Sequence, residues 1–374
     1  MAPRISRMHI GILTGGGDCP GLNALIRAAT LALLRRGFRV SGIERGFWGL
    51  MRDRVRPLCQ DDVLDLTAQG GTILGAHNRA DPFRDFDHGG EDRSAQALAL
   101  ARSHGLDGVV ALGGDGTVAI ATQLHALGLP ILVIPKTIDN DVPGTDVAFG
   151  FDSAVAIATQ ALDRLRTTAQ AHDRVMILET MGRREGWIAL AAGLGGGADL
   201  ILIPERPFDL EVVVRQCQMG QVYQTHLTRE GPGMSPGVGR GTVICVAEGA
   251  HAKGQGLTVA HHLSASPDPV RLGGVAEHLR TQLEPRLQSE VRTTQLGHLQ
   301  RGGSATSHDR HLATLLGSAA ADLVARGSFG HLVALRHGQC TAVPLHEVAG
   351  RTRPVPPDHA WMQAADALGV GFGV

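Results

Sequence analysis

Short apolar runs that read as buried strands alternate with longer periodic runs that read as helices along most of this chain. The strand-like runs are Met8–Leu13, Phe38–Ile43, Gly108–Leu112, Pro130–Ile134, Arg174–Glu179, Asp199–Ile203 and Thr242–Ala247. The helical runs include Leu22–Arg36, Ser94–His104, Val118–Leu127, Asp152–Thr168 and Asp209–His226. We interpret Ser94 and Asp209 as N-caps and Gly105 as a C-cap. This alternation predicts an α/β fold, a mainly parallel sheet with helices on both faces.

The whole chain sets a few limits on function. Its 374 residues suffice for one large or two ordinary domains. A formal net charge of −1 predicts no general affinity for nucleic acid or an anionic membrane. The five cysteines show no metal-ligand spacing, which argues against zinc or a disulfide framework. Because no signal peptide or run of membrane-spanning length is recognisable, we expect a cytoplasmic protein.

Two glycine-rich segments each follow a strand-like run and precede a helical one. They are Thr14–Gly21 and Gly113–Thr117. Glycines let backbone N–H groups approach phosphate oxygens, and the N-terminus of the following helix favours negative charge. Asp115 is the ligand type that Mg²⁺ prefers, together with phosphate oxygens. One such segment is equally typical of an ordinary tight turn, but two favour a phosphate site. Neither has the dinucleotide or P-loop spacing.

A third segment, Pro135–Asp141, places a lysine, a threonine and two aspartates directly after a strand-like run. Lys136 is one of only two lysines in the chain. Ligands of parallel sheets bind beyond the carboxyl ends of the strands, where we expect this segment and both glycine-rich segments to lie. Taken alone, the segment is also compatible with a solvated turn.

Polar residues also fall beside strand-like runs in the second half. They are Arg174, Arg183, Glu248, Arg292, His298 and Arg301. Guanidinium groups suit a phosphate dianion, and a carboxylate suits sugar hydroxyls. Taken singly, each arginine is more typical of the surface, and His298 of a structural histidine. The hypothesis of a sugar-phosphate site rests on their shared placement at strand ends. Two other stretches, Gly231–Gly241 and Ala250–Asp268, read as loops.

Five ordered motifs resemble those of the phosphofructokinases. They are Thr14–Asn23, Gly113–Thr117, Pro135–Asp141, Met181–Arg183 and Gly297–Gly303. The resemblance spans about residues 8–330 and implies two doubly wound, mainly parallel-sheet domains with the active site in the cleft between them. Residues 1–150 and about 299–345 would form the donor domain, and 151–298 with the C-terminal tail the sugar-phosphate domain. The implied reaction is phosphoryl transfer from ATP or pyrophosphate to the 1-hydroxyl of fructose 6-phosphate, in a homo-oligomer.

The resemblance also implies a role for each matching residue. Asp139 resembles the general base, Thr137 a donor to the moving phosphoryl group, and Arg183 a charge-stabilising residue. The donor-binding positions are Gly17, Arg79, Gly114, Asp115, Gly116, Thr117 and Lys136, with Asp115 as the Mg²⁺ ligand. The substrate-binding positions are Thr137, Ile138, Asp139, Arg174, Met181, Gly182, Arg183, Glu248, Arg292, His298 and Arg301. Arg174 and Arg292 match residues that the family supplies across a subunit interface.

The chain departs from the family pattern at the donor site. Ala76–Arg79 is one residue longer than in common ATP-dependent members, so Arg79 is assigned as the donor-contacting arginine. Pyrophosphate users carry aspartate at the position of Gly116 and lysine at that of Lys136, whereas common bacterial ATP users carry glycine at both. A carboxylate at Gly116 would repel an ATP α-phosphate, so the glycine predicts ATP, with pyrophosphate as the alternative. The arginines of the bacterial allosteric site are not clearly reproduced.

Other classes of protein share single features of this sequence. A Gly-Gly-Asp-Gly-Thr turn also occurs in NAD kinases and lipid kinases, but these lack partners resembling Pro135–Asp141. A dehydrogenase would need the missing dinucleotide fingerprint. A sugar-phosphate sensor could dispense with Asp115 and Asp139, both of which are present. The sequence leaves open the acceptance of other sugar phosphates, the choice of dimer or tetramer, and regulation.

Overall fold

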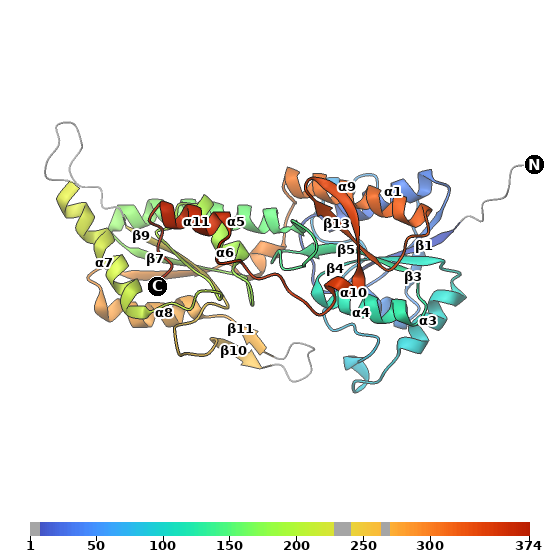
Figure 1. The fold of residues 1–374 in the computed structure, drawn as a ribbon, viewed down its shortest axis with the longest axis horizontal. Helices are drawn as coiled ribbons and strands as arrows, with labels where there is room; N and C mark the ends of the chain where they lie inside the picture. The colour runs from blue at the N-terminus through green and yellow to red at the C-terminus, as the bar shows by residue number, and fades with distance from the viewer. Residues whose placement is uncertain (1–7, 228–240, 263–269) are drawn as a thin grey trace, which may run out of the picture. The chain divides into compact units, whose positions relative to one another are not determined.

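The alternating strands and helices fold into two α/β units in the computed structural model, which describes residues 8–227, 241–262 and 270–374 (Figure 1). The described part of unit 1 comprises residues 8–153 and 301–353. That of unit 2 comprises residues 154–227, 241–262, 270–300 and 354–374. No helix within these residues is both long and apolar enough to cross a bilayer.

In unit 1, the described strands form one eight-stranded sheet in the order β14-β13-β5-β4-β1-β2-β3, with β6 paired to β5. The strands are β1 His9–Thr14, β2 Arg39–Ile43, β3 Val55–Pro57, β4 Gly108–Gly113, β5 Ile131–Thr137, β6 Phe149–Gly150, β13 His331–Arg336 and β14 Gln339–Pro344. All pairings are parallel except those of the two edge strands, β3 and β14. The predicted parallel sheet is therefore confirmed for the centre of the unit.

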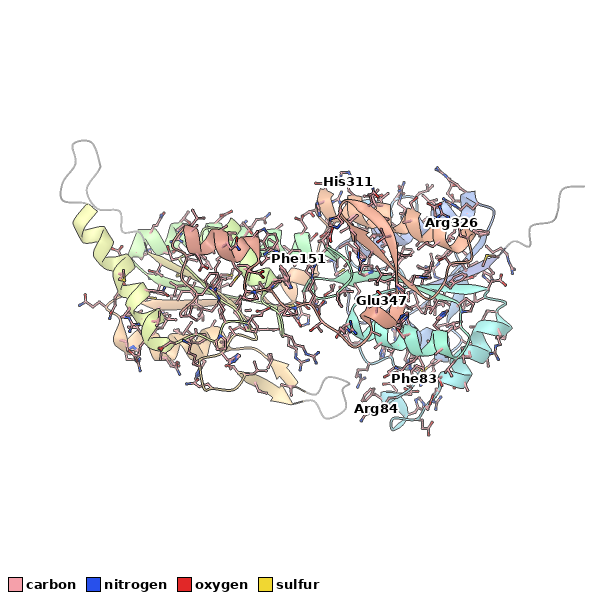
Figure 2. All side chains as sticks on the ribbon, in the orientation of Figure 1. Phe83, Arg84, Phe151, His311, Arg326 and Glu347 are labelled. Carbon is pink, nitrogen blue, oxygen red and sulfur yellow. The ribbon has the colours of Figure 1, made fainter. Side chains whose placement is uncertain are left out.

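Helices cover both faces of this sheet. They are α1 Leu22–Arg35, α2 Phe47–Met51, α3 Ser94–Ser103, α4 Asp115–Ala126, α9 Ser307–Ala325 and α10 Leu345–Val348, with 3₁₀ turns η1 Leu66–Ala68 and η2 Phe86–His88. Helices α1 and α9 lie together on one face, and α3, α4 and α10 lie on the other (Figure 1). Figure 2 labels His311 in α9, Arg326 at the C-terminal end of that helix, and Glu347 in α10. The core between α4 and the sheet is aliphatic, with Val118, Ala121 and Leu124 buried against strand residues.

Unit 2 contains a smaller sheet, whose described strands follow the order β12-β7-β9-β8 with every pairing parallel. Its strands are β7 Val175–Thr180, β8 Leu200–Leu202, β9 Thr242–Ala247 and β12 Val291–Gln295, and a separate antiparallel pair is formed by β10 Val259–His262 and β11 Val270–Leu272. Its helices are α5 Phe151–His172, of which residues 154–172 belong to this unit, α6 Trp187–Gly195, α7 Leu210–Leu227, α8 Val275–Leu283 and α11 Ala360–Ala367. Its 3₁₀ turns are η3 Glu284–Arg286 and η4 Gly297–Arg301, of which residues 297–300 belong to this unit. Residues of α7 and α8 share one apolar core with the sheet.

Several local predictions need correction. Ser94 is the first residue of α3, and Arg93 occupies the cap position. Asp209 does cap α7, since its Oδ1 accepts from the Glu211 N–H at 2.9 Å. The segment predicted as a loop over Ala250–Asp268 contains strand β10, and Gly231–Gly241 lies almost wholly outside the described residues.

Strand β5 is longer than predicted. It continues past Ile134 to Thr137, because Lys136 and Thr137 pair with the short strand β6. The strand therefore includes three residues of the predicted catalytic segment, Pro135, Lys136 and Thr137, all of them buried.

Candidate active site

Three predicted segments meet at the carboxyl edge of the unit 1 sheet. They follow β1, β4 and β5, which are neighbouring parallel strands. The Gly15 N–H donates to the Leu112 carbonyl at 2.8 Å, which joins the first glycine-rich loop to the end of β4. Gly113 is the register partner of Pro135, which brings the second loop beside the third segment. The sheet order thus places all three on one edge.

Thr117 sets the spacing of the two glycine-rich loops. Its side chain is 5% exposed and packs so closely against Gly15 and Gly113 that a Cβ at either glycine would overlap it. Both positions therefore require glycine for contact with Thr117 and not for a left-handed backbone. Thr117 was predicted to bind the donor, but its buried side chain packs between the two glycine-rich loops.

Asp115 and Gly116 form the exposed first turn of α4. Gly114 precedes them as the helix cap without a side-chain hydrogen bond, so N–H groups of the first turn are available to an anion. A Cβ added at Gly116 would meet no atom within 4 Å. Within the described residues, no three His, Cys, Asp or Glu side chains gather as a metal-binding group. Asp115 therefore fits a hard cation that takes its other ligands from phosphate and water.

Lys136 is buried beneath the first glycine-rich loop. The residue is 4% exposed, and its ammonium donates to the Gly17 carbonyl. Burial lowers the pKa of the ammonium. Arg301 reaches the same loop, where its Nη1 donates to the Asp18 carbonyl at 3.0 Å. Two cations thus hold carbonyls of the loop whose backbone N–H groups were predicted to bind phosphate.

The predicted catalytic turn follows β5. The Thr137 hydroxyl accepts from the Asp139 N–H at 3.0 Å, and Asn140 has a left-handed φ of 54°. Ile138, predicted to bind the substrate, is fully buried in the structure. Asp139 and Asp141 are each half-buried, yet one carboxylate oxygen of each is enclosed. Among the described residues, neither enclosed Oδ1 has a hydrogen-bond partner.

Burial and neighbouring negative charge raise the pKa of both carboxyl groups. Burial, with the negative charge of Asp141 next in importance, raises the pKa of Asp139 to about 7. Burial and the charge of Asp115 raise the pKa of Asp141. Arg301 and Lys136 act on Asp139 in the opposite direction, but more weakly. Asp139 therefore combines an unpartnered oxygen with a pKa close to neutral pH, as a general base requires.

The longer loop of residues 76–79 approaches this edge through His77. His77 forms an isolated bridge with Gly16 and stacks on Trp48, with ring centroids 6.1 Å apart. Arg79, the predicted donor-contacting arginine, is exposed and pairs with Asp87 at 3.5 Å. Phe83 and Arg84 lie farther along, before α3 (Figure 2).

In unit 2, three further predicted positions share the carboxyl edge of the smaller sheet. Met181 and Gly182 follow β7, and the Met181 N–H donates to Gln300 Oε1 at 2.7 Å. Glu248 follows β9, and its N–H donates to the Thr180 carbonyl at 2.9 Å. Gly182 has a φ of 131°, which favours glycine.

Arg183 and His298 complete this group of predicted positions in unit 2. Arg183 lies in the loop after β7, and a Cβ on Gly249 would overlap its carbonyl oxygen. His298 is exposed in η4, which follows β12. Since β7, β9 and β12 are parallel, the sheet brings Met181, Gly182, Arg183, Glu248 and His298 to one edge.

Arg174 and Arg292 lie at the opposite edge of the same sheet. Arg174 immediately precedes β7, Arg292 is the second residue of β12, and both pair with the carboxylate of Glu290. The six residues of β7 separate Arg174 from Met181, about 20 Å at the usual rise per residue. The structure therefore does not bring these arginines together with the other predicted substrate residues of unit 2.

The sequence analysis did not single out two residues at the unit 1 edge. Asn78 Oδ1 would lie 3.4 Å from a Cβ on Gly17. Cys19 is fully buried, and burial raises the pKa of its thiol to about 12. Its sulfur would lie 2.7 Å from a Cβ on Gly150, which packs the first loop against β6. Nothing in the local pattern indicates either contact, because each partner is distant along the chain.

Glycine-rich loops and paired carboxylates at the carboxyl edge of a parallel sheet define a phosphate-binding α/β protein of the phosphoryl-transfer type. A family model described as phosphofructokinase matches residues 9–324. The chain belongs to the phosphofructokinase family, which confirms the resemblance and the fold class inferred from the sequence.

Some curated relatives are named as ATP-dependent enzymes and others as pyrophosphate-dependent enzymes. An "ATP-dependent 6-phosphofructokinase" of Chloroflexus aurantiacus is 44% identical over 98% of this chain and 98% of its own length. A "Pyrophosphate--fructose 6-phosphate 1-phosphotransferase" of Amycolatopsis methanolica is 42% identical over 94% of this chain and 97% of its own. The solved phosphofructokinase of Pichia pastoris matches with a TM-score of 0.76 and 28% identity, covering 92% of this chain and 35% of that one. Membership of a kinase family implies a divalent metal.

Proposed function

We propose that this chain transfers a phosphoryl group from ATP to the 1-hydroxyl of fructose 6-phosphate, giving fructose 1,6-bisphosphate. The proposal rests mainly on the position, the enclosed oxygen and the raised pKa of Asp139. Its carboxylate lies at the carboxyl edge of β5, beside two glycine-rich loops, with an enclosed and unpartnered oxygen and a pKa raised to about 7. A base of that pKa can accept a sugar hydroxyl proton near neutral pH.

Phosphoryl transfer mainly requires positioning and compensation of charge on the phosphoryl oxygens. In unit 1, N–H groups of the α4 first turn would hold donor phosphates, and Asp115 would hold Mg²⁺. The metal, when bound, neutralises charge on the phosphate oxygens. The Thr137 hydroxyl would donate a hydrogen bond to the phosphoryl group that is transferred. Lys136 keeps the first loop in place through its hydrogen bond to Gly17.

The donor assignment rests on Gly116. The space around its missing Cβ is open, and the residue is exposed at the start of α4. This leaves room for an ATP α-phosphate that a carboxylate would repel. The ATP-dependent name of the Chloroflexus relative supports the same donor. The pyrophosphate-dependent name of the Amycolatopsis relative makes pyrophosphate the alternative.

The test is a coupled assay of the purified protein with fructose 6-phosphate and either ATP or pyrophosphate. We expect turnover with ATP that disappears on chelation of divalent metal and returns with Mg²⁺. An Asp139→Asn protein, measured alongside, controls for contaminating kinases. Turnover with pyrophosphate and none with ATP would overturn the donor assignment, and no turnover with either would overturn the reaction.

We further propose that the chain works as a homo-oligomer in the cytoplasm. The residues that would bind the sugar phosphate in their own copy are Met181, Gly182, Arg183, Glu248 and His298. Arg174 and Arg292, at the far edge of the sheet, would serve a neighbouring copy. Mixing inactive Arg174→Ala and Asp139→Ala proteins should restore part of the activity, because a hybrid contains an intact site. Sedimentation of the parent as a monomer would contradict the proposal.

A further inference from the structure

Arg353 donates hydrogen bonds to four residues of the segment that contains and follows the catalytic turn. Its Nε and Nη2 donate to the Asn140 carbonyl at 3.1 and 2.8 Å. Its Nη1 donates to the Thr145 carbonyl at 2.9 Å and to the Asp146 carbonyl at 2.8 Å. The Arg353 N–H donates to the Asp141 carbonyl at 2.8 Å. One planar guanidinium thus binds three carbonyls that lie within seven residues of one another.

These hydrogen bonds act on a turn whose backbone is unfavourable by itself. Asn140 stands between Asp139 and Asp141 with a φ of 54°, in the left-handed region that non-glycine residues rarely adopt. Such a conformation persists only where its surroundings impose it. The Asn140 side chain supplies one restraint, since its Oδ1 accepts from the Ala148 N–H at 3.0 Å. Arg353 supplies the other, from the carbonyl side of the same residue.

Loss of Arg353 would leave these carbonyls without their present partners. Asn140 and Thr145 are each 4% exposed while Arg353 is in place, so its loss would leave their carbonyls to pair with entering water or to find new partners by a movement of the turn. A movement of that kind would rotate the peptide planes on both sides of Asn140. The carboxylates of Asp139 and Asp141 would move with those planes.

We propose that Arg353 is a positioning residue that holds Asp139 in its reactive orientation through the backbone of Asn140 and Asp141. The inference rests on the proposed function, because it assigns Asp139 as the base. Arg353 itself contacts the turn and not the reacting atoms. Its effect is expected in the chemical step and not in donor binding, since the first glycine-rich loop has its own hydrogen bonds to Lys136 and Arg301.

Arg336 is a matched control. It is an exposed arginine of β13, and its Nε donates to the carbonyl of Gly144, between the residues that Arg353 binds. It therefore contacts the same segment without reaching Asn140. An effect common to both arginines would report general loosening of residues 140–148, whereas an effect confined to Arg353 would report the turn.

The kinetic experiment compares Arg353→Ala, Arg353→Gln and Arg336→Ala with the parent. We expect kcat of Arg353→Ala to fall about 10²-fold, the scale of a small misplacement of a reacting group, with less than about a threefold change in KM for ATP. Free guanidinium at millimolar concentration should restore part of kcat in Arg353→Ala and none in Arg336→Ala. An unchanged kcat in Arg353→Ala, or an equal loss in Arg336→Ala, would overturn the proposal. Arg353→Gln keeps two amide donors and serves if the alanine protein does not fold.

A second measurement does not depend on activity. Hydrogen–deuterium exchange followed by mass spectrometry should show faster exchange in peptides covering residues 137–149 of the Arg353 variants than in those of Arg336→Ala. Unchanged exchange would overturn the role of Arg353 even if kcat falls. Faster exchange in a protein whose parent has no phosphotransferase activity would instead leave the effect on the turn established and refute the proposed function.

Discussion

Replacing Gly116 by aspartate isolates the electrostatic basis of donor choice. The structure predicts that the variant folds normally, because a Cβ there meets no atom within 4 Å and the residue is exposed. A carboxylate in the first turn of α4 also interacts favourably with the helix dipole. Any loss of ATP use would therefore come from the new charge and not from a damaged fold.

The magnitude follows from Coulomb's law. A carboxylate about 5 Å from one phosphate charge, at an effective dielectric constant of about 20, is repelled by about 3 kcal/mol. That energy corresponds to a fall of about 10²-fold in kcat/KM for ATP. The neutral, equally large Gly116→Asn should lose less than about tenfold, and added salt should narrow the difference between the two. Steady-state kinetics and thermal melts of the three proteins make the comparison.

Two outcomes would refute this reasoning. If Gly116→Asp uses ATP as well as the parent does, no phosphate charge approaches this position. If Gly116→Asn loses as much as Gly116→Asp, the effect is steric, although the structure shows open space there.

Further predictions concern the turn and the loops. Asp139→Asn should lower kcat by about 10²–10⁴, the usual size of a general-base contribution, and an unchanged kcat would remove Asp139 from that role. In the parent, kcat/KM should rise with pH through about 7, because the base acts when ionised; a profile flat from pH 5 to 8 would contradict the assignment. Folding raises the pKa of this carboxyl from 3.8 to about 7, so its contribution to stability is complete below about pH 4 and is lost as pH rises to about 7. The thermal midpoint of Asp139→Asn, relative to that of the parent, should therefore rise as the pH increases. A difference between the two midpoints that does not change with pH would argue against a raised pKa of Asp139. Gly113→Ala should destabilise the fold by about 1–3 kcal/mol through overlap with Thr117. Adding Thr117→Ala, which removes Oγ1 and Cγ2 of Thr117 from the overlap, should recover part of this loss in urea denaturation, and no recovery would place the strain elsewhere.

The sequence predicted the strands of the site well where strand ends coincide with glycine. Gly113 ends β4 as expected, because the glycine that the Thr117 contact requires also breaks the apolar run. The prediction failed at β5, which continues through Lys136 and Thr137. Polarity suggested a loop there, but pairing with the distant β6 overrides local preference.

The sequence also predicted the placement of some site residues and not of others. The density of functional groups singled out the segment around Asp139, the family resemblance implied its role as a base, and the structure adds the enclosed oxygen. Arg174 and Arg292 were grouped with the other polar residues because they adjoin strands, and the family resemblance assigned them to a neighbouring subunit. The sheet shows that they adjoin the starts of β7 and β12 and the others the ends, a distinction that a common "strand end" criterion does not make.

The sequence by itself determined the α/β class, the glycine-rich loops and the dense group of polar residues in Pro135–Asp141, because each is encoded by residues adjacent in the chain. Only the tertiary structure decided how the turn is held and how its carboxylates ionise. Arg353 binds Asn140 from 213 positions away, and the pKa of Asp139 depends on burial and on charges from several elements. Such contacts are set by the order of strands in the sheet, which no local pattern records.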